Sequence, residues 1–184
     1  MSKQYIVPQN SPVTRFVFGN TKAAWFWLVV RLYVGWAWLE AGWDKIHNAA
    51  WVGDNAGGAL SGFIHGALAK TAGPYPDVQS WYAWFLTHAV LPHAPAWSHV
   101  VAWGELAVGV GLILGILTGV AAFFGAFMNF NFLMSGAVSV NPVLGVLALG
   151  VALAWKVGGY IGIDRWLLPR LGTPWRLGSI FRGK

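Results

Sequence analysis

Cysteine is absent from the 184 residues, and charged residues make up only 10% of them. The absence of cysteine excludes disulfides, iron–sulfur clusters held by thiolates and the Cys-x-x-Cys-His attachment of a c-type haem. An ordinary soluble domain carries about 25% charged residues, so this chain has too few charges to cover the surface of one. We therefore expect much of its surface to face lipid.

The apolar and aromatic content of the chain points the same way. Hydrophobic residues make up 57% of the sequence, and 13 residues are tryptophan. Tryptophan suits the membrane–water interface, because its ring is apolar and its single N–H is polar. The formal net charge is +6, but the basic residues are few and lie at the ends of apolar stretches. We interpret them as topology signals and not as a nucleic-acid site.

Four apolar stretches alternate with more polar segments. About 20 residues of helix cross the hydrocarbon core, and four stretches are close to that length: 23–46, 98–117, 120–138 and 143–163. Tight turns after the second and third stretches favour antiparallel neighbours. The predicted fold is all-α, an integral membrane four-helix antiparallel bundle over 23–164, between a polar leader (1–22) and a basic tail (165–184).

Residues 47–97 are too polar and too interrupted to cross a membrane. Two pieces, 56–69 and 78–90, carry apolar residues at helical spacing but are too short to span. We expect them to be helices that cap one end of the bundle or lie in the interface. Lysine and arginine are concentrated in the leader and the tail. The positive-inside rule therefore places both termini in the cytoplasm and this helical insert outside the cell.

Two charged residues lie near the middle of predicted spans, Arg31 in the first and Glu105 in the second. A charge at the bilayer centre costs roughly 3 kcal/mol or more. We therefore predict that Arg31 and Glu105 pair inside the bundle through the guanidinium fork. Asn129 and Asn131 bring amides to a similar depth, and at most one of them points at the pair. Either the pair is structural and holds the helices in register, or it is catalytic in a substrate, quinone or proton path.

A second polar cluster is predicted near the outer end of the first span, beneath the aromatic insert. Glu40, Asp44 and His47 are spaced by four and three residues, so they share one helix face, and Trp43 is adjacent. Proton-exchanging groups beside a ring that can stack suit a quinone head group. In this interpretation Glu40 and Asp44 are catalytic, while His47, Trp43 and Asn129 bind the cofactor. The alternative is plain solvation near a helix end.

Three motifs carry a resemblance to a known family. They are Arg31-Leu32, Gly35, Glu40, Gly42 and Lys45 in the first span; Gly104-Glu105, Gly109 and Gly115 in the second; and the run from Asn129 to Gly136 in the third. With them, the chain resembles the DoxX/DoxD family of four-helix bacterial and archaeal membrane proteins. The resemblance is closest to the DoxD branch, the membrane subunit of thiosulfate:quinone oxidoreductase. It implies a multi-pass protein of the inner (plasma) membrane of a prokaryote, with other protein subunits as partners and quinone as a redox partner.

The predicted function is a membrane subunit of a respiratory oxidoreductase assembly that anchors partner proteins and gives access to membrane quinone. The alternative is a non-catalytic structural or assembly subunit of a larger membrane complex. A small transporter is less favoured, because no inverted repeat or broken-helix pair stands out. No histidine lies within the middle of a predicted span, so we expect no haem and no metal site in the chain, and no iron–sulfur cluster. The lipid bilayer is an expected partner.

Overall fold

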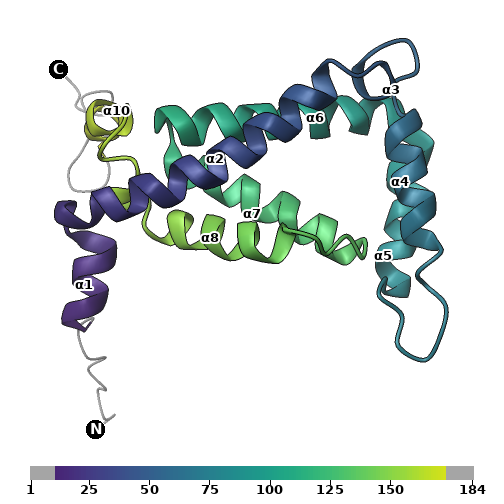
Figure 1. Cartoon of the computed structure of the whole chain (residues 1–184), viewed down its shortest axis with the longest axis horizontal. Coiled ribbons are helices and arrows are strands. Elements are labelled where there is room, and N and C mark those ends of the chain that lie inside the picture. Colours follow the sequence, from purple (N-terminus) through teal and green to yellow (C-terminus); the bar gives the residue numbers. More distant parts are fainter. Residues whose placement is uncertain (1–10, 173–184) are drawn as a thin grey trace, which may run out of the picture.

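The described part of the chain is a helical bundle with a helical cap across one end (Figure 1). The computed structural model describes residues 11–172, and every regular element in that range is helical. In chain order the elements are α1 (Pro12–Gly19), η1 (Thr21–Ala23), α2 (Ala24–Ile46), α3 (Ala49–Val52), α4 (Gly58–Leu68), α5 (Ser80–Phe85), η2 (Leu86–Val90), η3 (Leu91–His93), α6 (Ala94–Leu114), α7 (Thr118–Met134), α8 (Asn141–Leu153), α9 (Trp155–Gly158) and α10 (Asp164–Arg170). The all-α class is confirmed for these residues.

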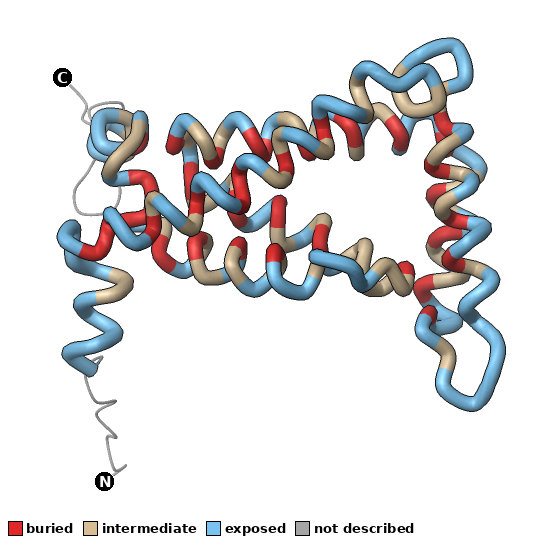
Figure 2. The backbone as a smooth tube through the Cα atoms, viewed as in Figure 1, coloured by how far each residue is buried: buried red, intermediate tan, exposed pale blue. Residues whose placement is uncertain are grey.

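Helices α2, α6, α7 and α8 form the bundle. The most extensive contacts join α2 to α6 and α7 to α8, which gives two layers (Figure 1). Helices α1 and α10 lie at one end of the bundle, and α3, α4 and α5 lie at the other. Buried residues face the interior along all four bundle helices (Figure 2). The core between the layers includes Trp27, Val34, Trp38, Leu112, Ala122, Ala148 and Val151.

Helices α2 and α6 approach closely because each has a glycine at the contact. Gly42 of α2 lies against the backbone of Leu106, so a Cβ atom there would overlap α6. Gly109 of α6 lies in the same way against the backbone of Leu39. Lipid gives helices no hydrophobic drive to associate, so close packing at small residues supplies the attraction. These two contacts set the antiparallel register of α2 against α6.

The insert between α2 and α6 forms the cap. Helices α4 and α5 stand across the end of the bundle (Figure 1). Together with η2 they bury a second apolar cluster, made of Leu60, Ile64, Ala67, Val78, Tyr82, Leu86 and Val90. The predicted short helices over 56–69 and 78–90 are therefore present. The chain continues from α5 into α6 without a loop, through a π-helical segment and a 3-10 turn that contains Pro92. The apolar spacing alone did not predict this continuity.

The last predicted span differs from the structure. A continuous helix over 143–163 is wrong, because α8 ends at Leu153, the single turn of α9 follows, and the chain then folds back as an irregular segment, 159–163. Glycines at 158, 159 and 162 disfavour continuation of the helix beyond α9, since glycine in a helix interior costs about 1 kcal/mol. This irregular segment hydrogen bonds to the end of α6, with the Ile163 N–H donating to the Leu114 carbonyl at 3.2 Å.

The helical run Ser80–Leu114, which comprises α5, η2, η3 and α6, is long and apolar enough to cross a membrane. Helices α7 and α8 are apolar but shorter, with 17 and 13 residues. Helix α2 has 23 residues and includes four charged ones. Crossing of the membrane by four helices therefore stays a prediction. The outer parts of the leader (1–10) and of the basic tail (173–184) lie outside the described residues.

Candidate functional site

Glu105 pairs with Lys45 and not with Arg31. The Lys45 Nζ lies 2.6 Å from Glu105 Oε2, and the Glu105 side chain is only 1% exposed. The same ammonium lies 5.1 Å from the centre of the Trp51 ring, over its face. The ion pair therefore joins the C-terminal end of α2 to the middle of α6, with an aromatic ring of α3 beside it. The expectation that Arg31 and Glu105 pair is wrong.

The register of α2 and α6 explains this outcome. Gly42 lies opposite Leu106, whereas the Arg31 guanidinium lies against Gly115 at the end of α6. Arg31 is thus about ten residues from Glu105 along α6, which is about 15 Å along a helix axis. Depths estimated from the middle of each apolar stretch are not precise enough to detect such an offset. The glycine contacts, which only the packed structure reveals, determine which charges meet.

Arg31 lies in a separate buried cluster near the ends of α6 and α8. Its side chain is 1% exposed, and its Nη2 donates a hydrogen bond to the Ile161 carbonyl at 2.8 Å. The Asp164 carboxylate, also buried, attracts the same guanidinium through its charge. Asp164 in turn accepts hydrogen bonds from the backbone N–H groups of Leu117 at 2.7 Å and Thr118 at 2.8 Å. It thereby satisfies amides at the start of α7, which no helical carbonyl reaches.

The predicted outer cluster is exposed on α2. Glu40, Trp43, Asp44 and His47 share one face as the spacing predicted, but all four are exposed and the insert does not cover them. Only Trp43 and His47 interact, through His47 Nδ1 and the Trp43 carbonyl at 2.9 Å and through rings 4.4 Å apart. Within the described residues, Glu40 and Asp44 have no hydrogen bond or ion pair. Their arrangement suits a surface contact better than an enclosed head-group site.

Asn129 is buried in the bundle core. It is 0% exposed, and neither its Oδ1 nor its Nδ2 finds a hydrogen-bond partner among residues 11–172. It lies at the contact between α7 and α8, next to Gly145. The Trp38 Nε1 is another buried donor without a partner in the described part of the chain. A cofactor role for Asn129 stays a prediction, and Asn129 is not among the residues that line the cavity between α6 and α7.

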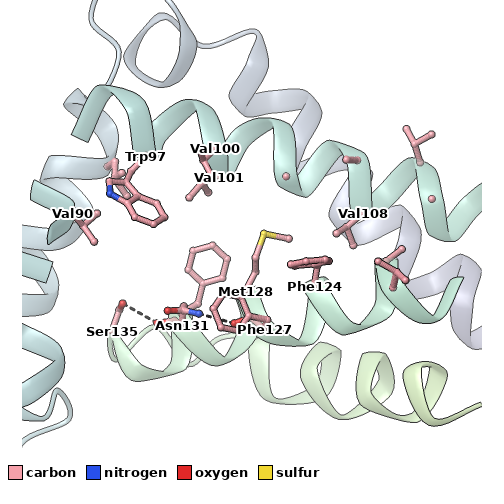
Figure 3. A pocket seen from close by; sticks show the side chains of 18 of the residues that line it. Val90, Trp97, Val100, Val101, Val108, Phe124, Phe127, Met128, Asn131 and Ser135 are labelled. Atoms are coloured by element: carbon pink, nitrogen blue, oxygen red, sulfur yellow. Dashed lines mark hydrogen bonds between the residues drawn. The ribbon is translucent and has the colours of Figure 1, made fainter. Parts of the chain in front are cut away.

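A large cavity lies between α6 and α7, where the two helices diverge from their tight turn (Figure 3). Its volume is about 750 Å³, within the range of ligand pockets. Apolar side chains supply nearly all of its lining, and α4, α5 and η2 cover one end. The side chains that line it include Val100, Val101, Val108, Val120, Phe124, Phe127 and Met128. This is the largest feature of the site that the sequence analysis missed.

One sequence signal for the cavity was available. Gly104, Ala107 and Gly111 recur on one face of α6 and line the cavity, so this face has little side-chain volume. Such a stripe of small residues is usually a close helix contact, and packing is the interpretation that the sequence favours for nearly all glycines of the spans. Here the Cβ position of Gly104 meets only the Met128 sulfur, at 3.7 Å. Space therefore remains where a packed contact was expected.

Three of the histidines bond to the backbone of their own helices. His47, His88 and His99 each pair through Nδ1 with the carbonyl oxygen four residues earlier, at 2.8–2.9 Å. Across residues 11–172, no group of three or more His, Asp or Glu side chains is placed to hold a metal ion. These contacts give the histidines a structural part at the ends of helices.

Sequence comparison identifies the family of the chain. The DoxX family model matches residues 26–140, from the first turn of α2 to the turn before α8. No match was found among curated proteins or among solved structures. The matched region is more than half of the chain and includes α2, the cap, α6, α7 and the α6–α7 cavity, while α8 lies beyond it. The chain therefore belongs to the DoxX family of membrane proteins.

Proposed function

We propose that the chain is the membrane subunit of a DoxD-like respiratory oxidoreductase assembly and that it takes up quinone from the bilayer in the α6–α7 cavity. Partner subunits supply the electrons, and the quinone accepts them together with protons. The residues of this chain bind the quinone, orient it and exclude water from it. The protein lies in the plasma membrane of a prokaryote, with both ends of the chain in the cytoplasm.

The α6–α7 cavity is the observation that carries this proposal. Its lining on α6 extends from Trp97 to Gly111, which is about 21 Å at about 1.5 Å per residue. The hydrocarbon core is about 30 Å thick, so a long apolar tail can lie in the cavity along the helices. A nearly uniform apolar lining suits an isoprenoid chain and disfavours a polar metabolite. Thiosulfate, a small anion, would find no charged group among the residues that line this cavity.

The alternative function, a non-catalytic assembly subunit, is favoured by the exposed acidic face of α2. Glu40 lies about 9 Å from the end of α2, at about 1.5 Å per residue, and a carboxylate at that depth is costly in lipid. A neighbouring subunit with a basic side chain would relieve this cost. Both functions can coexist, since Glu40 and Asp44 do not line the cavity.

The proposal is tested by extracting quinone from the protein purified in nanodiscs with its native lipids. Gly104→Phe would fill the cavity, because the Cβ position of Gly104 points into open space beside Met128. Val146→Phe is the matched control, since Val146 is 71% exposed on α8 and outside the cavity lining. We expect quinone to co-purify with the wild type and the control and to be lost from Gly104→Phe. Absence of quinone from the wild type, or equal retention by Gly104→Phe, overturns the proposal.

A further inference from the structure

The polar atoms of the α6–α7 cavity are gathered at one end. Tyr82 of α5, Asn131 of α7 and Ser135, which follows α7, line the end that α4 and α5 cover. The opposite end, at the α6–α7 turn, is lined by Ile116, Leu117 and other apolar residues. Figure 3 shows Asn131 and Ser135 near one limit of the cavity and the apolar side chains of Met128 and Phe124 farther from that limit. The cavity is therefore amphipathic along its length.

The polar groups at this end have spare hydrogen-bonding capacity. The Tyr82 hydroxyl lies 3.1 Å from both the main-chain carbonyl oxygen and the side-chain Oδ1 of Asn131. It has only one hydrogen to donate, so it can bond only one of these two oxygens at a time. Asn131 Nδ2 uses one N–H on the Phe127 carbonyl at 2.8 Å, which leaves its second N–H available. Ser135 Oγ donates to the Asn131 carbonyl at 2.9 Å and keeps lone pairs that can accept. A ligand here can meet both a donor and acceptors.

Aromatic rings surround the same end. Phe63 of α4 meets Phe132 of α7 edge to face at 6.0 Å, and Phe85 of α5 meets Trp97 of α6 in the same way at 6.5 Å. All four residues line the cavity. These rings, supplied by several elements, are placed to make offset or edge-to-face contact with a flat ligand ring. The polar atoms and these rings occupy one end of the cavity together.

We propose that Tyr82, Asn131 and Ser135 form a head-group subsite for an amphiphile with one long apolar tail and a flat ring that bears carbonyl or hydroxyl oxygens. The inference rests on the proposed function and gives the bound quinone a direction. Its ring lies under α4 and α5, at the end of the bundle far from α1 and α10, and its tail extends toward the α6–α7 turn. In the predicted topology this places quinone chemistry at the outer face of the membrane.

Binding of two probes to the full chain in phosphatidylcholine nanodiscs tests the subsite. The probes are a decyl-benzoquinone and decylbenzene, which has the tail and a ring but no carbonyl oxygen. Tyr82→Phe removes only the hydroxyl, and we expect it to weaken decyl-benzoquinone binding about threefold to tenfold, the effect of one hydrogen bond. The affinity of the Tyr82→Phe variant for decylbenzene should be unchanged, and that result also shows that the variant is folded. Thr87→Val is the control, because its hydroxyl bonds the Ala83 carbonyl outside the cavity.

Photo-cross-linking separates this inference from the proposed function. A quinone with a diazirine on its ring should label α5 and the last turn of α7, and one with a diazirine at the end of its tail should label the α6–α7 turn. The head-group subsite is overturned, and the proposed function left intact, by either of two results. The first is labelling of the cavity in the reverse direction, and the second is an equal loss of affinity for both decyl probes in Tyr82→Phe. Absence of cavity labelling by either reagent overturns both.

Discussion

Removal of the Asp164 carboxylate is expected to destabilise the bundle more than removal of its buried cationic neighbour. Asp164→Ala leaves the backbone amides of Leu117 and Thr118 unsatisfied in a buried site, after loss of hydrogen bonds of 2.7 and 2.8 Å. It also leaves Arg31 buried without the nearby negative charge. Hydrogen bonds to a charged group contribute about 1.5–3 kcal/mol each. Two such bonds, together with the lost attraction to Arg31, give an expected loss of about 3–5 kcal/mol.

Arg31→Met should have a much smaller effect. The Nε and Nη1 atoms of Arg31 have no hydrogen-bond partner among residues 11–172, so methionine forfeits only the bond to the Ile161 carbonyl. It also removes the cost of holding a charge away from water, and Asp164 keeps both of its amide donors. We expect a loss of about 1 kcal/mol. In the double variant, Arg31 is absent, so the loss of Asp164 no longer leaves a buried cation without a counter-charge. The destabilisation of the double variant should therefore be below the sum of the single effects by at least about 1 kcal/mol.

The assay is unfolding of the purified protein in mixed micelles by titration with SDS, followed by far-ultraviolet circular dichroism. Asp164→Asn serves as the isosteric variant, since it retains one acceptor oxygen and should lie between wild type and Asp164→Ala. Equal destabilisation by Arg31→Met and Asp164→Ala would refute the reasoning, because it would mean that the guanidinium is the main stabilising group. Strict additivity in the double variant would show that the two charges do not interact.

Three further outcomes are expected. Glu105→Gln should lower the free energy of unfolding by about 2–4 kcal/mol, because it leaves the partner ammonium without its counter-charge. Glu40→Gln should change the same free energy by less than about 0.5 kcal/mol. The SDS titration compares the two variants, and similar effects would contradict the contrast between buried Glu105 and exposed Glu40. Gly109→Val should disrupt the α2–α6 contact more than Gly109→Ala, measured as loss of a monodisperse peak in size-exclusion chromatography, and a valine variant that behaves as wild type would refute the proposed close approach. In whole cells, a membrane-impermeant maleimide should label the Asp54→Cys variant and not the Arg165→Cys variant. The chain has no native thiol to interfere. The reverse labelling pattern would show that the predicted topology is inverted.

The outer cluster and the cavity show how far spacing can predict a site. Periodicity placed Glu40, Asp44 and His47 on one face, and the structure has them so, but periodicity does not say whether a face is enclosed. The structure leaves that face exposed and instead has an open-sided cavity beside Gly104. An empty volume depends on how two helices diverge from a turn, and no residue in either helix encodes that angle by itself.

The sequence alone determined the all-α fold class, the helical stretches from 24 to 134 and the short helices of the insert. It could do so because composition and apolar periodicity act over neighbouring residues. It also showed that buried charges need partners. Only the tertiary structure decided the partners, since a shift of about ten residues in helix register moves a side chain about 15 Å. Contacts at Gly42 and Gly109 set that register, so Lys45 reaches Glu105, while Arg31 bonds the Ile161 carbonyl at the opposite end of the bundle and is attracted there by the charge of Asp164.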